Sequence, residues 1–234
     1  MSERSCKTKV LALLQSPDQK TALTELRSMP GRELVHGLFS GICRADETIR
    51  WRAITAMGVV VPKIADEDME AARVIMRRLM WSLNDESGGI GWGAPEAMAE
   101  ILGQHEQLAL EYAHILVSYM REDSNFLEHN TLQRGLMWAI GRAARTWTTL
   151  FITLKAQIYL LPYLQSDDPE VVGLAAWAAG AFPDRQLAAA LNGLTDDQRQ
   201  VRCFIDNRIQ GTTIGALAGD SIRTINLALT AGSH

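Results

Sequence analysis

The sequence predicts an all-α fold: a right-handed α-solenoid of stacked helical pairs, with a possible short β-hairpin near the C-terminus. Apolar residues recur at intervals of three and four along most of the chain, which is typical of amphipathic helices. A motif of small residues also recurs, which is typical of stacked repeats. Of the 234 residues, 47% are hydrophobic and 21% are charged, a composition that excludes a disordered or collagen-like chain.

The first helices are short, and the clearest of them is expected over 34–42, where apolar residues repeat at helical spacing. The next helix begins at Asp46 and is expected to break near Pro62, because a proline inside a helix lacks an N–H donor. The acids 66–68 are assigned to the first turn of the following helix and the cations 77–78 to its end, the order that the helix dipole favours.

Further helices follow from the same apolar spacing. They are expected at 94–104, 106–121, 129–145, 149–164, 168–181 and 184–193. No convincing run of alternating apolar residues interrupts them, so the sequence predicts no strand before about residue 200.

The motif of small residues ends in a glycine at five places. The glycines are Gly58, Gly103, Gly141, Gly180 and Gly219, at intervals of 45, 38, 39 and 39 residues. Such a length holds two helices and two turns, and each pair of helices must stack on its neighbours to bury both faces. We therefore expect the helices of Gly103, Gly141 and Gly180 to stack in parallel, with each glycine touching a neighbouring helix.

Residues 164–180, Leu-Gln-Ser-Asp-Asp-Pro-Glu-Val-Val-Gly-Leu-Ala-Ala-Trp-Ala-Ala-Gly, resemble a HEAT-like repeat of the phycobilisome-lyase type. In that pattern an Asp-Pro-Glu-Val turn starts a helix that ends in Ala-Leu-Gly. Pro169 and Glu170 suit a helix start, because the first N–H groups need no partner there and the dipole favours an acid. Val172 departs from the pattern, which usually has Arg at that position. The resemblance implies a scaffold and not a particular activity.

We predict one α-solenoid domain over residues 1–234. Residues 1–45 are expected to form N-terminal capping helices, 46–193 the HEAT-like repeats, and 194–234 a C-terminal hairpin and capping helix.

Residues 200–205 and 208–210 are interpreted as two short strands, because Asp206 and Asn207 between them tolerate the positive φ of a tight turn. The alternative is another HEAT-type helix over 196–202. The hairpin is preferred, since the strand residues lack the small side chains of the other repeats.

The composition also indicates the cellular compartment and the class of partner. The cysteines, Cys6, Cys43 and Cys203, are odd in number and far apart, so neither a disulfide framework nor a metal site is expected, and no cofactor is implied. No signal peptide or membrane helix is recognised, which predicts a cytoplasmic protein without membrane contact. The net charge of −4 makes nucleic acid an improbable partner.

The most distinctive segment, residues 77–96, joins one helical pair to the next. It combines cations, acids, an amide, two indoles and several glycines, so it is either a ligand-binding loop or an ordered turn between repeats. Its candidate partner-binding residues are Arg77, Arg78, Trp81, Asn84, Asp85, Glu86 and Trp92. The two acids either pair internally with the two arginines or face a partner.

A second candidate is a stripe of cations and tryptophan on one helix face. Arg134, Trp138, Arg142 and Arg145 lie at i, i+4, i+8 and i+11, and Arg134 and Arg142 are its partner-binding candidates. Such a stripe can bind an anion or stack on a base. The alternative is a seam between repeats in which the arginines pair with acids such as Glu96 or Glu128.

These observations favour a non-enzymatic scaffold that binds a protein or peptide partner on a concave face, with no catalytic residues, because no nucleophile, metalloprotease or P-loop motif is present. One alternative is a HEAT-like DNA glycosylase, for which Trp81 and Asp85 share a helix face, although the net negative charge opposes it. Another, from the family resemblance, is a lyase or chaperone that handles a tetrapyrrole or other cofactor.

Overall fold

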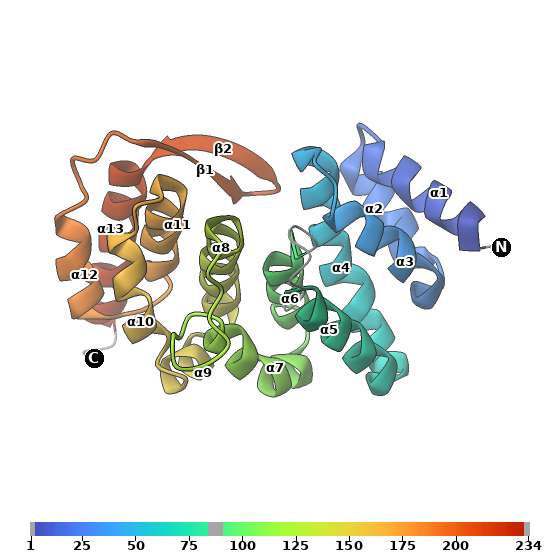
Figure 1. The fold of residues 1–234 in the computed structure, drawn as a ribbon, viewed down its shortest axis with the longest axis horizontal. Coiled ribbons are helices and arrows are strands. Elements are labelled where there is room, and N and C mark those ends of the chain that lie inside the picture. Colours follow the sequence, from blue (N-terminus) through green and yellow to red (C-terminus); the bar gives the residue numbers. More distant parts are fainter. Residues whose placement is uncertain (1–2, 84–90, 232–234) are drawn as a thin grey trace. The chain divides into compact units, whose positions relative to one another are not determined.

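The computed structural model describes residues 3–83 and 91–231 (Figure 1). The chain divides into two compact units, Met1–Ala109 and Leu110–His234, and each is described by itself. Within the described residues, no helix is both long enough and apolar enough to cross a bilayer.

The first unit consists of helices packed in succession (Figure 1). They are α1 (Glu3–Gln15), α2 (Gln19–Ser28), α3 (Gly31–Ile42), α4 (Glu47–Glu67), α5 (Met69–Leu83) and α6 (Ala94–Leu102). A further helix, α7 (Glu106–Ser118), begins in this unit and continues into the second. The long helix α4 lies at the centre, in contact with α3, α5 and α6.

Helix α4 begins where the sequence predicts, with the Asp46 carboxylate accepting a hydrogen bond from the Ile49 N–H. The predicted break near Pro62 is wrong, because the helix continues to Glu67 with the proline inside it. The assignment of the acids 66–68 to one first turn is also wrong. Only Asp68 caps α5, by accepting from the Ala71 N–H, whereas the other two end α4.

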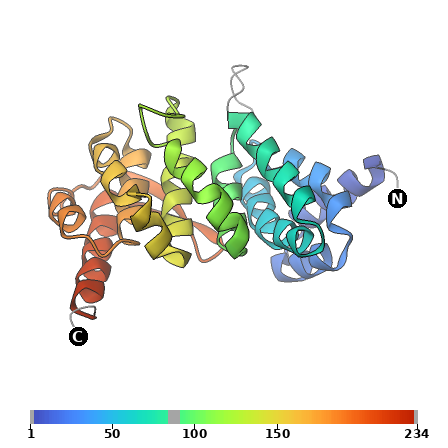
Figure 2. The same cartoon turned by 90° about the horizontal axis from the view of Figure 1, so that it is seen from below.

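The second unit contains helices and a hairpin. Its elements are α8 (Asn130–Thr146), α9 (Thr148–Thr153), α10 (Ala156–Tyr159), the 3-10 helix η1 (Leu161–Gln165), α11 (Pro169–Ala179), α12 (Arg185–Asn192), β1 (Gln200–Ile205), β2 (Arg208–Thr213) and α13 (Ile214–Ala231). Helix α11 packs against both α8 and α13 and has hydrophobic residues around most of its circumference. Figure 2 shows the connection between α7 and α8 as an open loop.

The single helix predicted over 149–164 is wrong, because three short helices take its place. Lys155 adopts a left-handed conformation with φ of 62°, which ends α9 before α10 begins. Pro162 then lies in the first turn of η1.

The predicted hairpin is confirmed. β1 and β2 pair antiparallel, with Ile205 opposite Arg208. Asp206 and Asn207 have φ of 50° and 60°, the positive values that a tight two-residue turn requires. The last helix follows directly, and the Thr213 hydroxyl accepts a hydrogen bond from the Ala216 N–H in its first turn.

Glycines of the recurring motif lie where helices touch. A Cβ atom at Gly58 would lie 2.8 Å from the Cβ of Glu100 on α6, and one at Gly180 would lie 2.7 Å from the Ser221 hydroxyl on α13. Gly141 makes an equally close contact with α11. Gly219 differs, because a Cβ there would meet only the end of the Arg223 side chain, at 3.6 Å.

Candidate partner-binding site

Helix α5 buries one face and exposes another that carries apolar side chains. Ala72, Ile75, Met76, Leu79 and Leu83 are buried. On the opposite side, Val74, Arg78 and Trp81 lie at i, i+4 and i+7, so they form one exposed face. Val74 is 54% exposed and Trp81 is 75% exposed. We call these three residues the α5 face.

Arg77 lies beside this face and has an internal partner. Its guanidinium donates to the Glu70 carboxylate at 2.5 Å, and Arg73 approaches the same carboxylate at 3.6 Å. The hydrogen bond from Arg77 is the largest factor that lowers the pKa of Glu70. Arg77 is therefore held along its own helix by a solvent-exposed pair.

Arg78 points instead into a pocket of about 490 Å³ between α1, α3 and α5. The pocket is lined by Lys7, His36, Phe39, Ser40, Ile42, Cys43, Arg44, Arg78 and Ser82. The Arg78 guanidinium lies 3.9 Å from the centre of the Phe39 ring, a cation–π contact that fixes its position. We call this cavity the basic pocket.

Cys43 lines the basic pocket at the end of α3 and is exposed, whereas Cys6 and Cys203 are buried. Partial burial raises the pKa of the Cys43 thiol, and the positive charge of Arg78 opposes this rise. An accessible thiol therefore lies next to an arginine.

The other predicted residues of this segment are placed as follows. Trp92 is half-buried and precedes Gly93, whose φ of 78° ends the connection into α6. Asn84, Asp85 and Glu86 lie outside the described residues. The structure thus brings Arg78 and Trp81 together on the α5 face.

The arginine stripe of α8 is a seam within the second unit. Arg134 donates to both carboxylate oxygens of Asp168, at 2.6 and 3.1 Å, and pairs with Glu170 at 2.8 Å. The Asp168 carboxylate also accepts from two N–H groups at the start of α11. Burial alone would raise the pKa of Asp168, but these hydrogen bonds hold it below its ordinary value.

Trp138 and Arg145 of the stripe contact α11, and Trp138 also contacts the hairpin. Trp138 is buried, its indole N–H donates to the Phe204 carbonyl at 2.8 Å, and its ring stacks on Trp177. The Arg145 guanidinium lies 3.7 Å from the centre of the Trp177 ring and donates to the carbonyls of Gly141 and Trp177. Arg142 donates to the Thr146 hydroxyl. The acids that pair with Arg134 are Asp168 and Glu170 rather than Glu96 or Glu128.

Replacing Arg134 with glutamine is expected to destabilise the protein by roughly 1–2 kcal/mol, because a buried carboxylate loses a charged hydrogen-bond donor. Asp168→Asn should cost less than Asp168→Ala, since asparagine still caps α11. Urea unfolding followed by circular dichroism measures these differences. Equal stability of Arg134→Gln and the unmodified protein would contradict a structural role for this pair.

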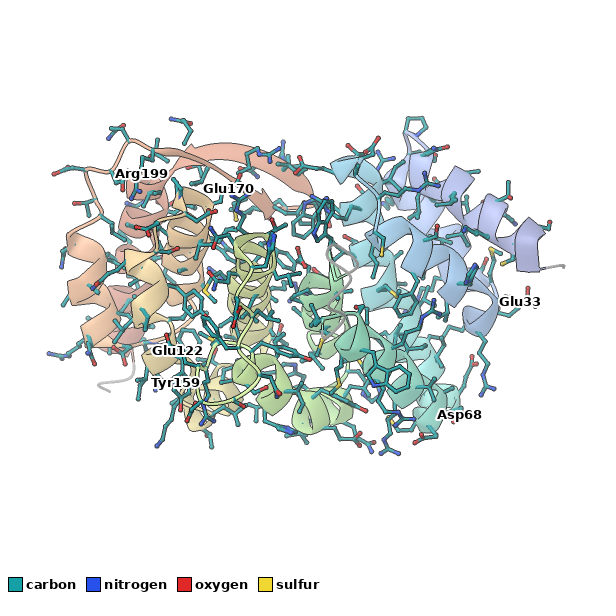
Figure 3. The ribbon with its side chains drawn as sticks, in the orientation of Figure 1. Glu33, Asp68, Glu122, Tyr159, Glu170 and Arg199 are labelled. Carbon is teal, nitrogen blue, oxygen red and sulfur yellow. The ribbon has the colours of Figure 1, made fainter. Side chains whose placement is uncertain are left out.

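The structure also contains a pocket of about 670 Å³ that the sequence analysis missed, in the second unit. It lies between the loop after α7 and the α10–η1 segment, with Glu122 and Tyr159 among its lining residues (Figure 3). The Tyr163 hydroxyl at its edge donates to the Met120 carbonyl. Its lining residues come from separate short elements, so no local motif indicates them.

No group of three or more potential metal ligands occurs among the residues with described positions. No protein-family model matches the chain, and no curated protein matches it.

Solved structures do resemble it. An engineered protein matches with a TM-score of 0.53 and 17% identity, over 95% of this chain and 97% of its own. A designed armadillo repeat protein in complex with the peptide (KR)4 matches with a TM-score of 0.52 and 18% identity, over 93% of this chain and 98% of its own. The chain has the fold of a helical-repeat protein. A second engineered protein, 16% identical, also has a TM-score of 0.52 and covers 94% of this chain.

Proposed function

We propose that the chain is a non-enzymatic scaffold that binds a peptide segment of a protein partner through the α5 face and the adjoining basic pocket. The observation that carries this proposal is Trp81, a large apolar side chain with 75% of its surface exposed, on the same helix face as the arginine that enters the pocket. Tryptophan and arginine are the residue types that most often dominate binding energy at protein interfaces.

The surroundings of Trp81 strengthen this proposal. Val74 lies about two helical turns before Trp81 and is 54% exposed, so apolar area extends along the face. Arg78 between them is fixed on Phe39, so less side-chain freedom is lost when a partner binds. The designed armadillo repeat protein with a bound peptide has a fold similar to this chain, which is consistent with peptide binding by such a fold.

The test selects peptides from a displayed random library on the immobilised full chain and measures the affinity of the enriched peptides by titration. Trp81→Ala is expected to weaken binding by about tenfold or more, the effect of removing an aromatic anchor. Leu227→Ala is the matched control, because Leu227 on α13 is 71% exposed and lies in the other unit.

Leu227→Ala should bind the same peptides within about twofold, since surface substitutions away from the contact have small effects. The proposal fails if no peptide is enriched, or if the enriched peptides bind Trp81→Ala as tightly as the unmodified chain.

We further propose that the scaffold is of the HEAT-like, phycobilisome-lyase type. This is supported by residues 164–180, in which Asp168 caps α11, Pro169 occupies its first turn, and Gly180 meets α13 at close range.

A further inference from the structure

The basic pocket concentrates positive charge in a chain whose net charge is −4. Lys7, Arg44 and Arg78 line it, together with His36, and none of its described lining residues is acidic. Elsewhere in the same unit the arginines Arg32 and Arg77 each face a carboxylate.

No ion pair joins Lys7, Arg44 or Arg78 to a carboxylate within the described parts of the chain, 5–83 and 91–231. Cations gathered around one cavity repel one another, and a bound anion relieves that repulsion. The charge of the described lining is therefore complementary to an anionic ligand.

The lining of the pocket favours a carboxylate attached to an apolar group. Its floor includes Phe39, 7% exposed, and Ile42, 1% exposed. The Arg78 guanidinium lies on the Phe39 ring, and a guanidinium fork can donate two parallel hydrogen bonds to one carboxylate. Arg78 also belongs to the α5 face, on which Trp81 is exposed and can contact an apolar side chain of a partner.

We propose that the basic pocket binds a carboxylate of an acidic peptide segment, whose neighbouring apolar side chain packs on Trp81. This inference rests on the proposed function and specifies the chemistry of its partner. A nucleic acid is a poorer match, because its backbone requires cations along a track of phosphates, whereas these cations surround a single cavity.

The alkylation rate of Cys43 can report on the charge of this pocket, since Cys43 is the exposed one of the three cysteines and lines the cavity. The rates of its alkylation by iodoacetate, an anion, and by iodoacetamide, a neutral reagent, are compared at low salt and at 0.5 M salt by mass spectrometry, with N-acetylcysteine as reference. We expect an iodoacetate-to-iodoacetamide ratio about threefold or more above the reference at low salt, because nearby cations attract the anionic reagent and added salt screens them.

Arg78→Gln should bring this ratio close to that of the reference, whereas Arg78→Lys should largely keep it. Arg77→Gln is the matched control: it removes the same charge from the adjacent position, but Arg77 pairs with Glu70 and does not line the pocket. Melting curves of all variants show whether each one folds. If Arg78 only stabilises the end of α3, Arg78→Gln melts lower with an unchanged ratio, which overturns the proposal.

A second set of measurements tests ligands. The peptides are the enriched ones and versions of them in which Asp and Glu are replaced by Asn and Gln. The other ligands are N-acetyl-glutamate, inorganic phosphate and duplex DNA. Acidic peptides should protect Cys43 from iodoacetamide and bind Arg78→Gln about tenfold more weakly, the typical effect of losing a charged hydrogen bond. The amide versions should bind both proteins with similar, lower affinity.

Two further outcomes overturn the inference in distinguishable ways. If the enriched peptides need Trp81 but are neutral or basic, the proposed function stands and the acidic partner is wrong. If no peptide is enriched while phosphate or DNA protects Cys43, the pocket binds anions and both the peptide partner and the proposed function fail.

Discussion

Replacing Gly141 with alanine is expected to destabilise the second unit by about 1–3 kcal/mol, and replacing it with leucine by more, because the contact has no room for a side chain. A Cβ atom at this position would lie 2.6 Å from the Trp177 ring and 2.8 Å from the Cα of Ala178. The second of these is a backbone atom of α11 and cannot move aside alone. The ring is itself in contact with Trp138 and Arg145.

Gly219→Ala is the matched control, since it makes the same change within helix α13, where a Cβ would meet only the end of Arg223. It is expected to stabilise by roughly 0.5–1 kcal/mol, the usual gain for alanine over glycine inside a helix. Urea unfolding monitored by tryptophan fluorescence and circular dichroism measures both effects. Equal stability of Gly141→Ala and the unmodified chain would show that α8 and α11 do not touch at this glycine.

The contrast between these two glycines shows how far the repeat pattern predicts the packing. The predicted close contacts of Gly141 and Gly180 are confirmed, and Gly58 of the same motif also makes one. The contact predicted for Gly103 stays a prediction. At Gly219 the same motif occurs, but no close contact to another helix accompanies it in the structure. Sequence periodicity identifies residues that are able to make a close contact, and the neighbouring element decides whether one is made.

The helix boundaries show the same division between local and tertiary causes. The caps at Asp46 and Asp168 are local hydrogen bonds, so the sequence predicts them. The unbroken helix at Pro62 and the left-handed Lys155 are not indicated by local propensity, which disfavours both. Pro62 is buried within the first unit, where packing outweighs the local preference.

The candidate site was only half predictable for a related reason. Arg78 and Trp81 share a helix face, and helical spacing is sufficient to infer this. Lys7 comes from α1, His36 from the middle of α3 and Cys43 from its end, so only the tertiary fold brings them to the same cavity. Helical spacing likewise predicts that the α8 stripe shares one face, but the acids that pair with Arg134 lie one repeat later in the chain.

Glu96 is expected to make the stability of the protein depend on pH. It lies in the first turn of α6, is only 9% exposed, and its Oε2 atom has no hydrogen-bond partner among the residues that the structure describes. Burial raises the pKa of this carboxyl from 4.5 to about 7, against the opposing effects of its own N–H and of Arg50. The folded protein therefore holds a proton that the unfolded chain releases at lower pH.

The direction in which the free energy of unfolding changes with pH follows from this difference in proton binding. Between pH 4.5 and about 7 the folded state binds more protons than the unfolded state, so the free energy of unfolding falls as the pH rises. The loss is complete above about pH 7 and amounts to about 3 kcal/mol, at 1.36 kcal/mol for each unit of pKa difference. Below pH 4.5 the carboxyl is protonated in both states, and this contribution to pH dependence disappears.

Glu96→Gln removes the ionisable group while keeping its size and shape. It is expected to raise the free energy of unfolding at pH 8 by up to about 3 kcal/mol relative to the unmodified protein, and to change it little at pH 4.5. Urea unfolding at intervals across this range measures the difference, with Glu128→Gln at an exposed position as the control. A stability difference between Glu96→Gln and the unmodified protein that stays constant from pH 4.5 to pH 8 would contradict titration of Glu96 in the folded protein.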